Sequence, residues 1–233
     1  MRKLLVIISL ACIAAACTPQ PKHNTLTVFA AASLHSSFRI LEEDVERQNP
    51  GLDIILSSDG SQNLVDQVIA GAPADVLATA DTKSMARAQD KMQLNATEFA
   101  SNSLVLVTPP DNPHGINEVS EKLNQVKTVV CAPEVPCGAA TAELFKQFPW
   151  QLKPVSEEQK VTDVVGKVRS GQADAGVVYR TDAQGLHAVE IPGAQQHPNR
   201  YMIATLTGDN PFTDYVLSPE GQARLAELGF GAP

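Results

Sequence analysis

The sequence is poor in positive charge and, beyond its first 16 residues, has no long apolar run. It carries 18 lysine and arginine side chains against 26 aspartate and glutamate side chains, and this acidic balance does not suggest a nucleic-acid partner. No second apolar segment reaches membrane-spanning length. The chain has neither an internal repeat nor a low-complexity block, and its length suits two small domains or one large one.

Spacings typical of metal and nucleophile sites are absent as well. No His-x-x-x-His or Glu-His pair occurs, which favours surface or loop positions for the histidines over metal ligation. The five are His23, His35, His114, His187 and His197. No serine lies in a G-x-S-x-G motif, and Ser33 and His35 are two positions apart in an expected helix, so they point apart. A secreted serine hydrolase using Ser33 is therefore only a remote alternative.

The N-terminus has the layout of a secretory signal. A basic start is followed by an apolar run over 4–16 and then by Cys17, which predicts a signal peptide over 1–16. The segment from Ala14 to Cys17 resembles the lipobox of bacterial lipoproteins, although leucine is usual where Ala14 stands. This resemblance implies lipidation of Cys17, a tether over 17–25 and an extracytoplasmic, lipid-anchored protein. The alternative is an ordinary secreted protein cleaved after an alanine.

Beyond the tether, strand and helix patterns alternate. Apolar runs predict strands, and residues at helical spacing predict helices. The expected strands are 26–30, 52–57, 75–79, 104–107, 128–131 and 175–179, and the expected helices are 34–45, 63–70, 139–148, 163–170 and 219–228. Strands that are apolar on both faces and alternate with helices are typical of an α/β fold with parallel sheet covered by helices.

Two strand-to-helix junctions carry serines among small residues. Ser33 follows "FAAA" and Ser61 follows "DG", so each hydroxyl and the amides of the next turn face a point beyond the sheet. The small side chains let a ligand approach the backbone, and Gly60 can adopt the angles of a tight turn. A lone serine would be an N-cap, but two such junctions could converge on one anion.

Several segments together resemble the molybdate-binding proteins of bacterial ABC importers. They are "FAAASL", "SSDGSQNLVDQVIAGAPADVLATAD", "VPCG" and "AGVVYRTDA", and "AGAPADV" followed by "AD" is the most specific part. The resemblance runs from Leu26 to the "GF" near the end. It implies a monomeric binding protein, without cofactor or enzymatic activity, that delivers molybdate and also tungstate to an ABC permease. A relative tuned to sulfate or phosphate is the nearest alternative.

The resemblance also implies a fold. It is the two-lobed periplasmic-binding-protein fold of type II, with mixed, mostly parallel sheets flanked by helices and the ligand in the cleft between the lobes. Lobe 1 would comprise 26–103 and 201–233, and lobe 2 would comprise 104–200. Two crossovers, near 102–107 and 199–204, would form the hinge on which the lobes close.

When the binding residues of the family are matched to positions in this sequence, the resemblance implies that uncharged hydrogen-bond donors hold a tetrahedral dianion. Serines would donate through hydroxyl and backbone N–H, one tyrosine through its phenol, and three further residues through backbone N–H alone. The six are Ser33, Ser61, Ala80, Cys137, Val161 and Tyr179. No residue ligates the metal directly, because molybdate is held through its oxygens. A lining made only of hydrogen-bond donors favours oxyanions that carry no proton. Asp59 could accept a proton from a protonated oxyanion, but it is expected to cap its turn instead.

Cysteine usage predicts one disulfide. Cys12 leaves with the signal peptide and Cys17 is lipidated, so Cys131 and Cys137 are the thiols that remain. Their separation is not C-x-x-C, which favours a structural bridge in an oxidising compartment over a redox pair. The lone Trp150 beside Pro149 is expected to pack at a helix end.

Overall fold

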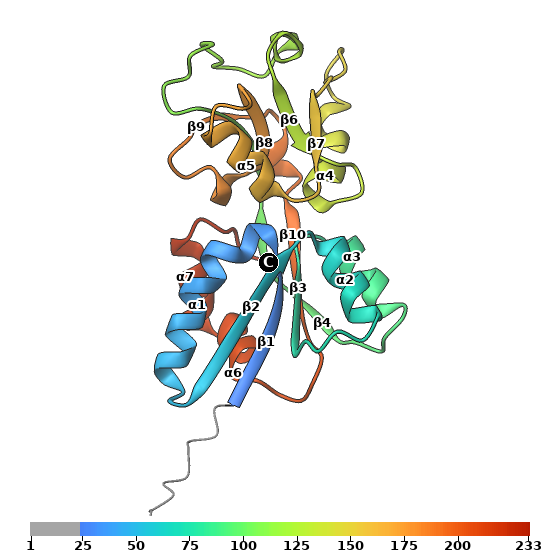
Figure 1. Cartoon of the computed structure of the whole chain (residues 1–233), viewed down its shortest axis with the longest axis vertical. Coiled ribbons are helices and arrows are strands. Elements are labelled where there is room, and N and C mark those ends of the chain that lie inside the picture. Colours follow the sequence, from blue (N-terminus) through green and yellow to red (C-terminus); the bar gives the residue numbers. More distant parts are fainter. Residues whose placement is uncertain (1–23) are drawn as a thin grey trace, which may run out of the picture.

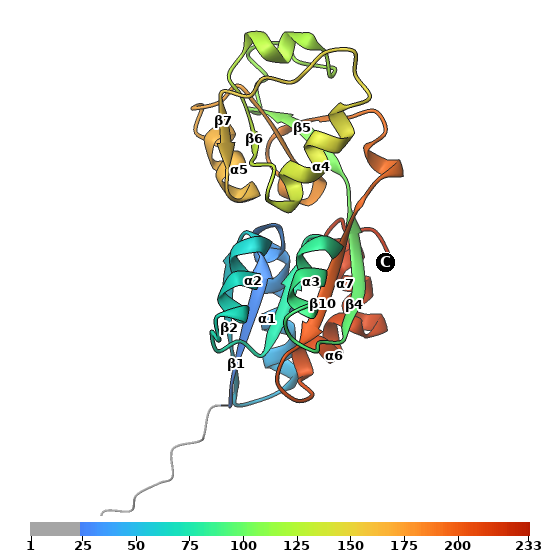
Figure 2. The same cartoon turned by 90° about the vertical axis from the view of Figure 1, so that its right-hand side faces the viewer.

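The computed structural model describes residues 24–233, which form two lobes stacked along the long axis of the molecule (Figure 1, Figure 2). Each lobe is built on one five-stranded sheet. The predicted signal peptide (1–16), Cys17 and the tether up to residue 23 lie outside the described residues. Within 24–233, no helix has both the length and the apolar character needed to cross a membrane.

The sheet of lobe 1 has the order β2-β1-β3-β10-β4. Its central strand β1 pairs parallel with β2 and β3, whereas β10 runs antiparallel between β3 and β4. The strands are β1 Asn24–Ala31, β2 Leu52–Asp59, β3 Val76–Thr79, β4 Ala96–Asn102 and β10 Asn199–Thr205. The late strand β10 thus returns the chain to the lobe in which it began.

Helices cover both faces of this sheet (Figure 1). One face carries α1 His35–Gln48, α6 Pro211–Leu217 and α7 Pro219–Glu227, and the other carries α2 Ser61–Ile69 and α3 Thr82–Gln89. Phe38 of α1 is fully buried, as its helical spacing predicts, and its ring meets those of Phe99 and Phe212. On the opposite face, Leu64 of α2 and Met85 of α3 belong to a second apolar cluster.

The sheet of lobe 2 has the order β7-β6-β8-β5-β9 and is covered by two helices. Here β6 pairs parallel with β7 and β8, and β5 runs antiparallel to β8 and β9. The strands are β5 Leu104–Thr108, β6 Thr128–Cys131, β7 Ser156–Glu158, β8 Ala175–Tyr179 and β9 His187–Glu190, and the helices are α4 Pro136–Phe145 and α5 Val161–Arg169. Short 3-10 helices are η1 Ala32–Leu34, η2 Glu121–Gln125, η3 Arg180–Asp182 and η4 Ala194–Gln196.

Two neighbouring segments join the lobes (Figure 2). One runs from β4 into β5 through Ser103, and the other enters β10 from lobe 2. They lie side by side because Asn199 and Asn102 are register partners in the β10–β4 pair. The first crossing falls within the predicted segment 102–107, whereas the second lies between β9 and β10, over 191–198, because the predicted segment 199–204 is part of β10 itself.

The predicted two-lobed α/β fold is confirmed, with several local differences. Both sheets contain more antiparallel pairing than the mostly parallel prediction, because each lobe receives one strand from the other: β5 continues directly from β4, and β10 enters lobe 1 from lobe 2. β1 begins at Asn24, inside the predicted tether, and β10 begins at Asn199, two residues before the predicted segment 201–233. Helix α4 spans Pro136–Phe145 instead of 139–148, since Pro136 suits the first helical position.

Candidate functional site

A small cavity of about 20 Å³ lies between the lobes, at the carboxyl ends of β1, β3 and β8. Its lining contains all six residues that the sequence assigns to an oxyanion site: Ser33, Ser61, Ala80, Cys137, Val161 and Tyr179. Seven further residues complete the lining: Ala31, Ala32, Gly60, Val135, Pro136, Gln159 and Lys160. The fold therefore brings together predicted site residues as far apart in the sequence as Ser33 and Tyr179.

Ser33 reaches the cavity from the 3-10 turn η1 that joins β1 to α1. The preceding alanines from Ala30 to Ala32 are buried, so small side chains surround the approach to the backbone. Ser33 does not cap its turn through its side chain. Its hydroxyl instead accepts a hydrogen bond of 2.9 Å from the phenol of Tyr201, which leaves the serine proton free to donate elsewhere.

Ser61 is the first residue of α2 and is almost completely buried. The backbone N–H of Ala80 donates to its hydroxyl at 3.0 Å, so these two predicted donors are in direct contact. Asp59 does not line the cavity. Its carboxylate accepts hydrogen bonds from the Gly60 N–H at 2.8 Å and from the Asn63 amide at 3.3 Å, so it stabilises the turn as expected.

Lobe 2 contributes the first turns of two helices. Cys137 is the second residue of α4 and Val161 the first residue of α5. Cys131 and Cys137 form the predicted disulfide, which ties the start of α4 to the end of β6. Gly138 is required at this junction, because a Cβ there would lie 1.8 Å from the Ala132 carbonyl oxygen. The helix start is thereby held close to the sheet.

Tyr179 supplies the third hydroxyl from the end of β8 and is 1% exposed. Its phenol oxygen accepts a hydrogen bond of 2.9 Å from the side-chain amide of Asn199. Burial raises the pKa of the phenol well above its usual value, so Tyr179 stays protonated at neutral pH and can donate. The same Asn199 amide donates to the Ala80 carbonyl at 3.2 Å.

The electrostatic character of the cavity suits an anion. The helices α2, α4 and α5 all begin at it, and helix N-termini present free N–H groups and partial positive charge. Among the described residues that line it, none is an aspartate or glutamate. Lys160, the N-cap residue of α5, is a lining residue that sequence reasoning missed. Its neighbourhood, "EEQKVTDVVG", departs from the pattern of the family that the sequence resembles, so the resemblance did not indicate Lys160 as a site residue.

The lobes approach each other closely beside this cavity. Gln62 of lobe 1 donates from its side chain to the Gln159 carbonyl of lobe 2 at 3.3 Å. Gly60 leaves little space at the same place, since a Cβ on it would lie 2.7 Å from the same carbonyl oxygen. The cavity is therefore bordered by backbone and side chains from both lobes.

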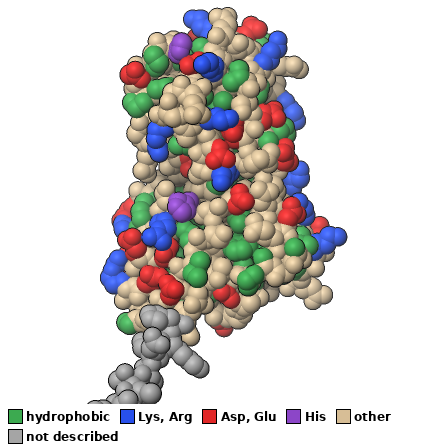
Figure 3. Space-filling model, viewed as in Figure 1, with side chains coloured by type: hydrophobic (Ala, Val, Ile, Leu, Met, Phe, Trp, Pro, Cys, Tyr) green, Lys and Arg blue, Asp and Glu red, His purple; other side chains and the backbone are tan. Residues whose placement is uncertain are grey.

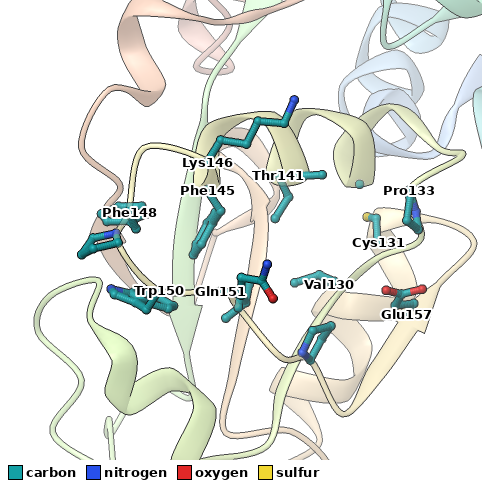
Figure 4. Close-up of a pocket in the computed structure, with 15 residues that line it drawn as sticks. Val130, Cys131, Pro133, Thr141, Phe145, Lys146, Phe148, Trp150, Gln151 and Glu157 are labelled. Atoms are coloured by element: carbon teal, nitrogen blue, oxygen red, sulfur yellow. The ribbon is translucent and has the colours of Figure 1, made fainter.

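A second, larger cavity of about 600 Å³ lies within lobe 2 beside α4 (Figure 4). Its lining includes an aromatic cluster in which Trp150 stacks on Phe148 and meets Phe145 edge to face. Trp150 thus packs just beyond a helix end, as the sequence predicts. Of the six predicted site residues, none belongs to this lining, so the larger cavity is separate from the one between the lobes.

The arrangement around Ser33 does not resemble a nucleophile site. Its hydroxyl is bonded to Tyr201, whereas the ring of His35 lies 3.0 Å from the hydroxyl of Ser58. Within residues 24–233, no group of three or more His, Cys, Asp or Glu side chains is placed to hold a metal ion. Charged side chains of both signs are interspersed over both lobes on the face shown in Figure 3.

Comparisons with known proteins agree with this geometry. The family model described as "Bacterial extracellular solute-binding protein" matches residues 26–231. The molybdate-binding protein ModA of Mycobacterium tuberculosis is 37% identical over 228 residues, covering 92% of this chain and 87% of that protein. Its counterpart in Escherichia coli is 29% identical, covering 88% of each chain. The periplasmic molybdate-binding protein of Azotobacter vinelandii has the same fold, with a TM-score of 0.76 at 20% identity over 89% of this chain and 99% of that one.

Proposed function

Because the chain belongs to the family of bacterial extracellular solute-binding proteins, we propose that it binds molybdate and delivers it to an ABC permease. Relatives at 37% and 29% identity are named molybdate-binding proteins, which supports molybdate as the ligand. They are binding proteins, and this chain is likewise a binding protein and not an enzyme. Tungstate has the same charge and nearly the same shape, so we propose it as a second ligand.

The proposal rests most directly on the residues that line the cavity between the lobes. Three hydroxyls and the first turns of three helices, drawn from both lobes, meet at one cavity whose described lining contains no carboxylate. An anion there would receive hydrogen bonds from Ser33, Ser61 and Tyr179 and from the backbone N–H groups of Cys137 and Val161. The Ala80 N–H donates to the Ser61 hydroxyl and would support that donor. Lys160 adds positive charge at the same place.

Such a site can bind a dianion tightly without coordinating its metal. A hydrogen bond to a charged group contributes about 1.5–3 kcal/mol, and several of them sum to high affinity. The donors would contact the four oxygens of molybdate, so no metal ligand from the protein is needed. A ligand held by both lobes also stabilises their closed arrangement, in which Gln62 meets Gln159.

Delivery to a permease requires a protein that stays outside the cytoplasm near the membrane. We propose that Cys17, outside the described residues, is acylated and anchors the chain, and that the chain acts as a monomer. The exported protein should then partition into detergent, and Cys17→Ser should release it or leave it unprocessed. Exported protein that stays in the aqueous phase and lacks acylation would contradict the anchor.

Ligand identity is tested by titration calorimetry and thermal unfolding with molybdate, tungstate, sulfate and phosphate. At a concentration 100 times its dissociation constant, the true ligand should stabilise the protein by about 2.7 kcal/mol. We expect this response for molybdate and tungstate, and a much weaker one for sulfate and phosphate. A flat response to all four ions would contradict the proposed function, and a preference for sulfate or phosphate would assign the chain to a different ligand class.

A further inference from the structure

Each of the three hydroxyls at the cavity accepts a hydrogen bond from a protein donor. Ser33 accepts from the Tyr201 phenol at 2.9 Å, and Tyr179 accepts from the Asn199 amide at 2.9 Å. Ser61 accepts from the backbone N–H of Ala80 at 3.0 Å. A hydroxyl has one proton and cannot direct it toward a group that is donating to it. The proton of each hydroxyl is therefore left to point into the cavity.

The donor behind Tyr179 is fixed in orientation. One side-chain nitrogen of Asn199 bonds both to the Tyr179 phenol oxygen and to the Ala80 carbonyl oxygen, at 2.9 and 3.2 Å. The Ala80 carbonyl oxygen can only accept, so the Asn199 nitrogen beside it must carry the N–H groups, and the Tyr179 phenol oxygen must accept from the same nitrogen. Tyr179 consequently cannot donate to Asn199.

The donor behind Ser33 is a buried phenol. Tyr201 is completely buried, and burial raises the pKa of its phenol, so it keeps its proton. The phenol donates this proton to the Ser33 hydroxyl, whereas Asn102, on the neighbouring strand β4, donates its side-chain amide to the Thr181 hydroxyl at 2.8 Å. Asn102 and Asn199 face each other as register partners at the two crossings between the lobes.

We propose that Asn199 and Tyr201 are positioning residues that orient the Tyr179 and Ser33 hydroxyls so that their protons face the bound oxyanion. Neither residue lines the cavity, so each acts only through the residue that does. This inference rests on the proposed function of oxyanion binding.

Double-mutant cycles measured by molybdate titration test this inference. Tyr201→Phe removes one atom that does not touch the ligand, and should weaken molybdate binding about 3- to 10-fold. In a Ser33→Ala background the same substitution should cause no further loss, because the hydroxyl it orients is gone. Asn199→Ala should likewise lose most of its effect in a Tyr179→Phe background. Tyr215→Phe is the matched control, since Tyr215 bonds to Asp44 in the same lobe, away from the cavity.

The affinities of these variants support or contradict the positioning role. An equal loss with and without the Ser33 hydroxyl would mean that Tyr201 only supports the packing, and the inference would be wrong. Unchanged affinity in both Tyr201→Phe and Asn199→Ala would overturn it as well. A wild-type protein that does not bind molybdate would instead refute the proposed function, and with it the ligand on which this inference rests. Asn199→Ala provides an independent cycle if Tyr201→Phe lowers folding yield.

Discussion

Replacing Gly60 by alanine should weaken ligand binding while leaving the free protein as stable as before. Gly60 has φ −58° and ψ 138°, angles that alanine adopts without strain. Within lobe 1 the new methyl group meets mainly the flexible end of Gln62, but across the cavity it would lie 2.7 Å from the Gln159 carbonyl oxygen of lobe 2. Ordinary contact begins at 3.4 Å, so the lobes would have to separate locally by about 0.7 Å.

That separation determines the size of the effect. A hydrogen bond of 2.9 Å stretched by this amount falls outside bonding geometry, and losing one bond to the anion costs about 1.5–3 kcal/mol. The dissociation constant for molybdate should therefore rise about 10- to 100-fold in titration calorimetry. The unfolding temperature of the free protein should stay level or rise, since replacing glycine reduces the entropy of the unfolded chain.

The control for this substitution is Gly166→Ala in α5. A Cβ at Gly166 meets nothing within 4 Å, so this variant should keep wild-type affinity and gain slightly in stability. If Gly60→Ala binds molybdate as tightly as wild type, the lobes do not close on the ligand in the arrangement described, and the steric reasoning fails.

Further substitutions test the remaining parts of the account. Ser61→Ala should weaken molybdate binding about 10- to 100-fold in titration calorimetry, through loss of one charge-assisted hydrogen bond; unchanged affinity would make Ser61 only a structural residue. Tyr179→Phe should reduce affinity by a similar factor at constant unfolding temperature, whereas a fall in stability alone would place the phenol in the core. Cys131→Ser combined with Cys137→Ser should destabilise the protein by about 2 kcal/mol and weaken binding slightly; a variant that matches the wild type in chemical denaturation would show that the bridge contributes nothing. Burial raises the pKa of Asp182 to about 8, and one of its carboxylate oxygens is buried without a hydrogen-bond partner. The free energy of unfolding should therefore fall as the pH rises from the ordinary carboxyl range to about 8. Asp182→Asn should raise the unfolding temperature at pH 9 and hardly change it at pH 4; an equal shift at both pH values would contradict this.

The buried strands were predictable because their sequences carry their own signal. β6 and β8 match the predicted ranges 128–131 and 175–179, since uninterrupted apolar runs are typical of strands covered on both faces. The strand β10 was anticipated only as part of a crossing. Its sequence "NRYMIAT" mixes polar and apolar residues, because it lies between antiparallel neighbours and reaches into the hinge. The helix α3 was missed because few of its residues, among them Met85 and Ala88, are buried apolar ones.

The candidate site was predictable to the extent that it depends on local motifs. Ser33 and Ser61 follow strands among small residues, and that pattern alone indicated a ligand near the backbone. The residues behind the hydroxyls carry no such signal. Tyr201 meets Ser33 across 168 sequence positions, and the partners of Asn199 become apparent only when the two lobes are placed around the hinge. Contacts of this kind depend on tertiary packing, which spacing along the chain does not encode.

The most direct test of the central claim is a crystal structure of the protein with molybdate, located by the anomalous scattering of molybdenum. We expect one strong molybdenum peak in the cavity between the lobes, with oxygens within hydrogen-bonding distance of Ser33, Ser61 and Tyr179. A peak in the larger cavity beside Trp150, or no peak in crystals grown with saturating molybdate, would contradict it.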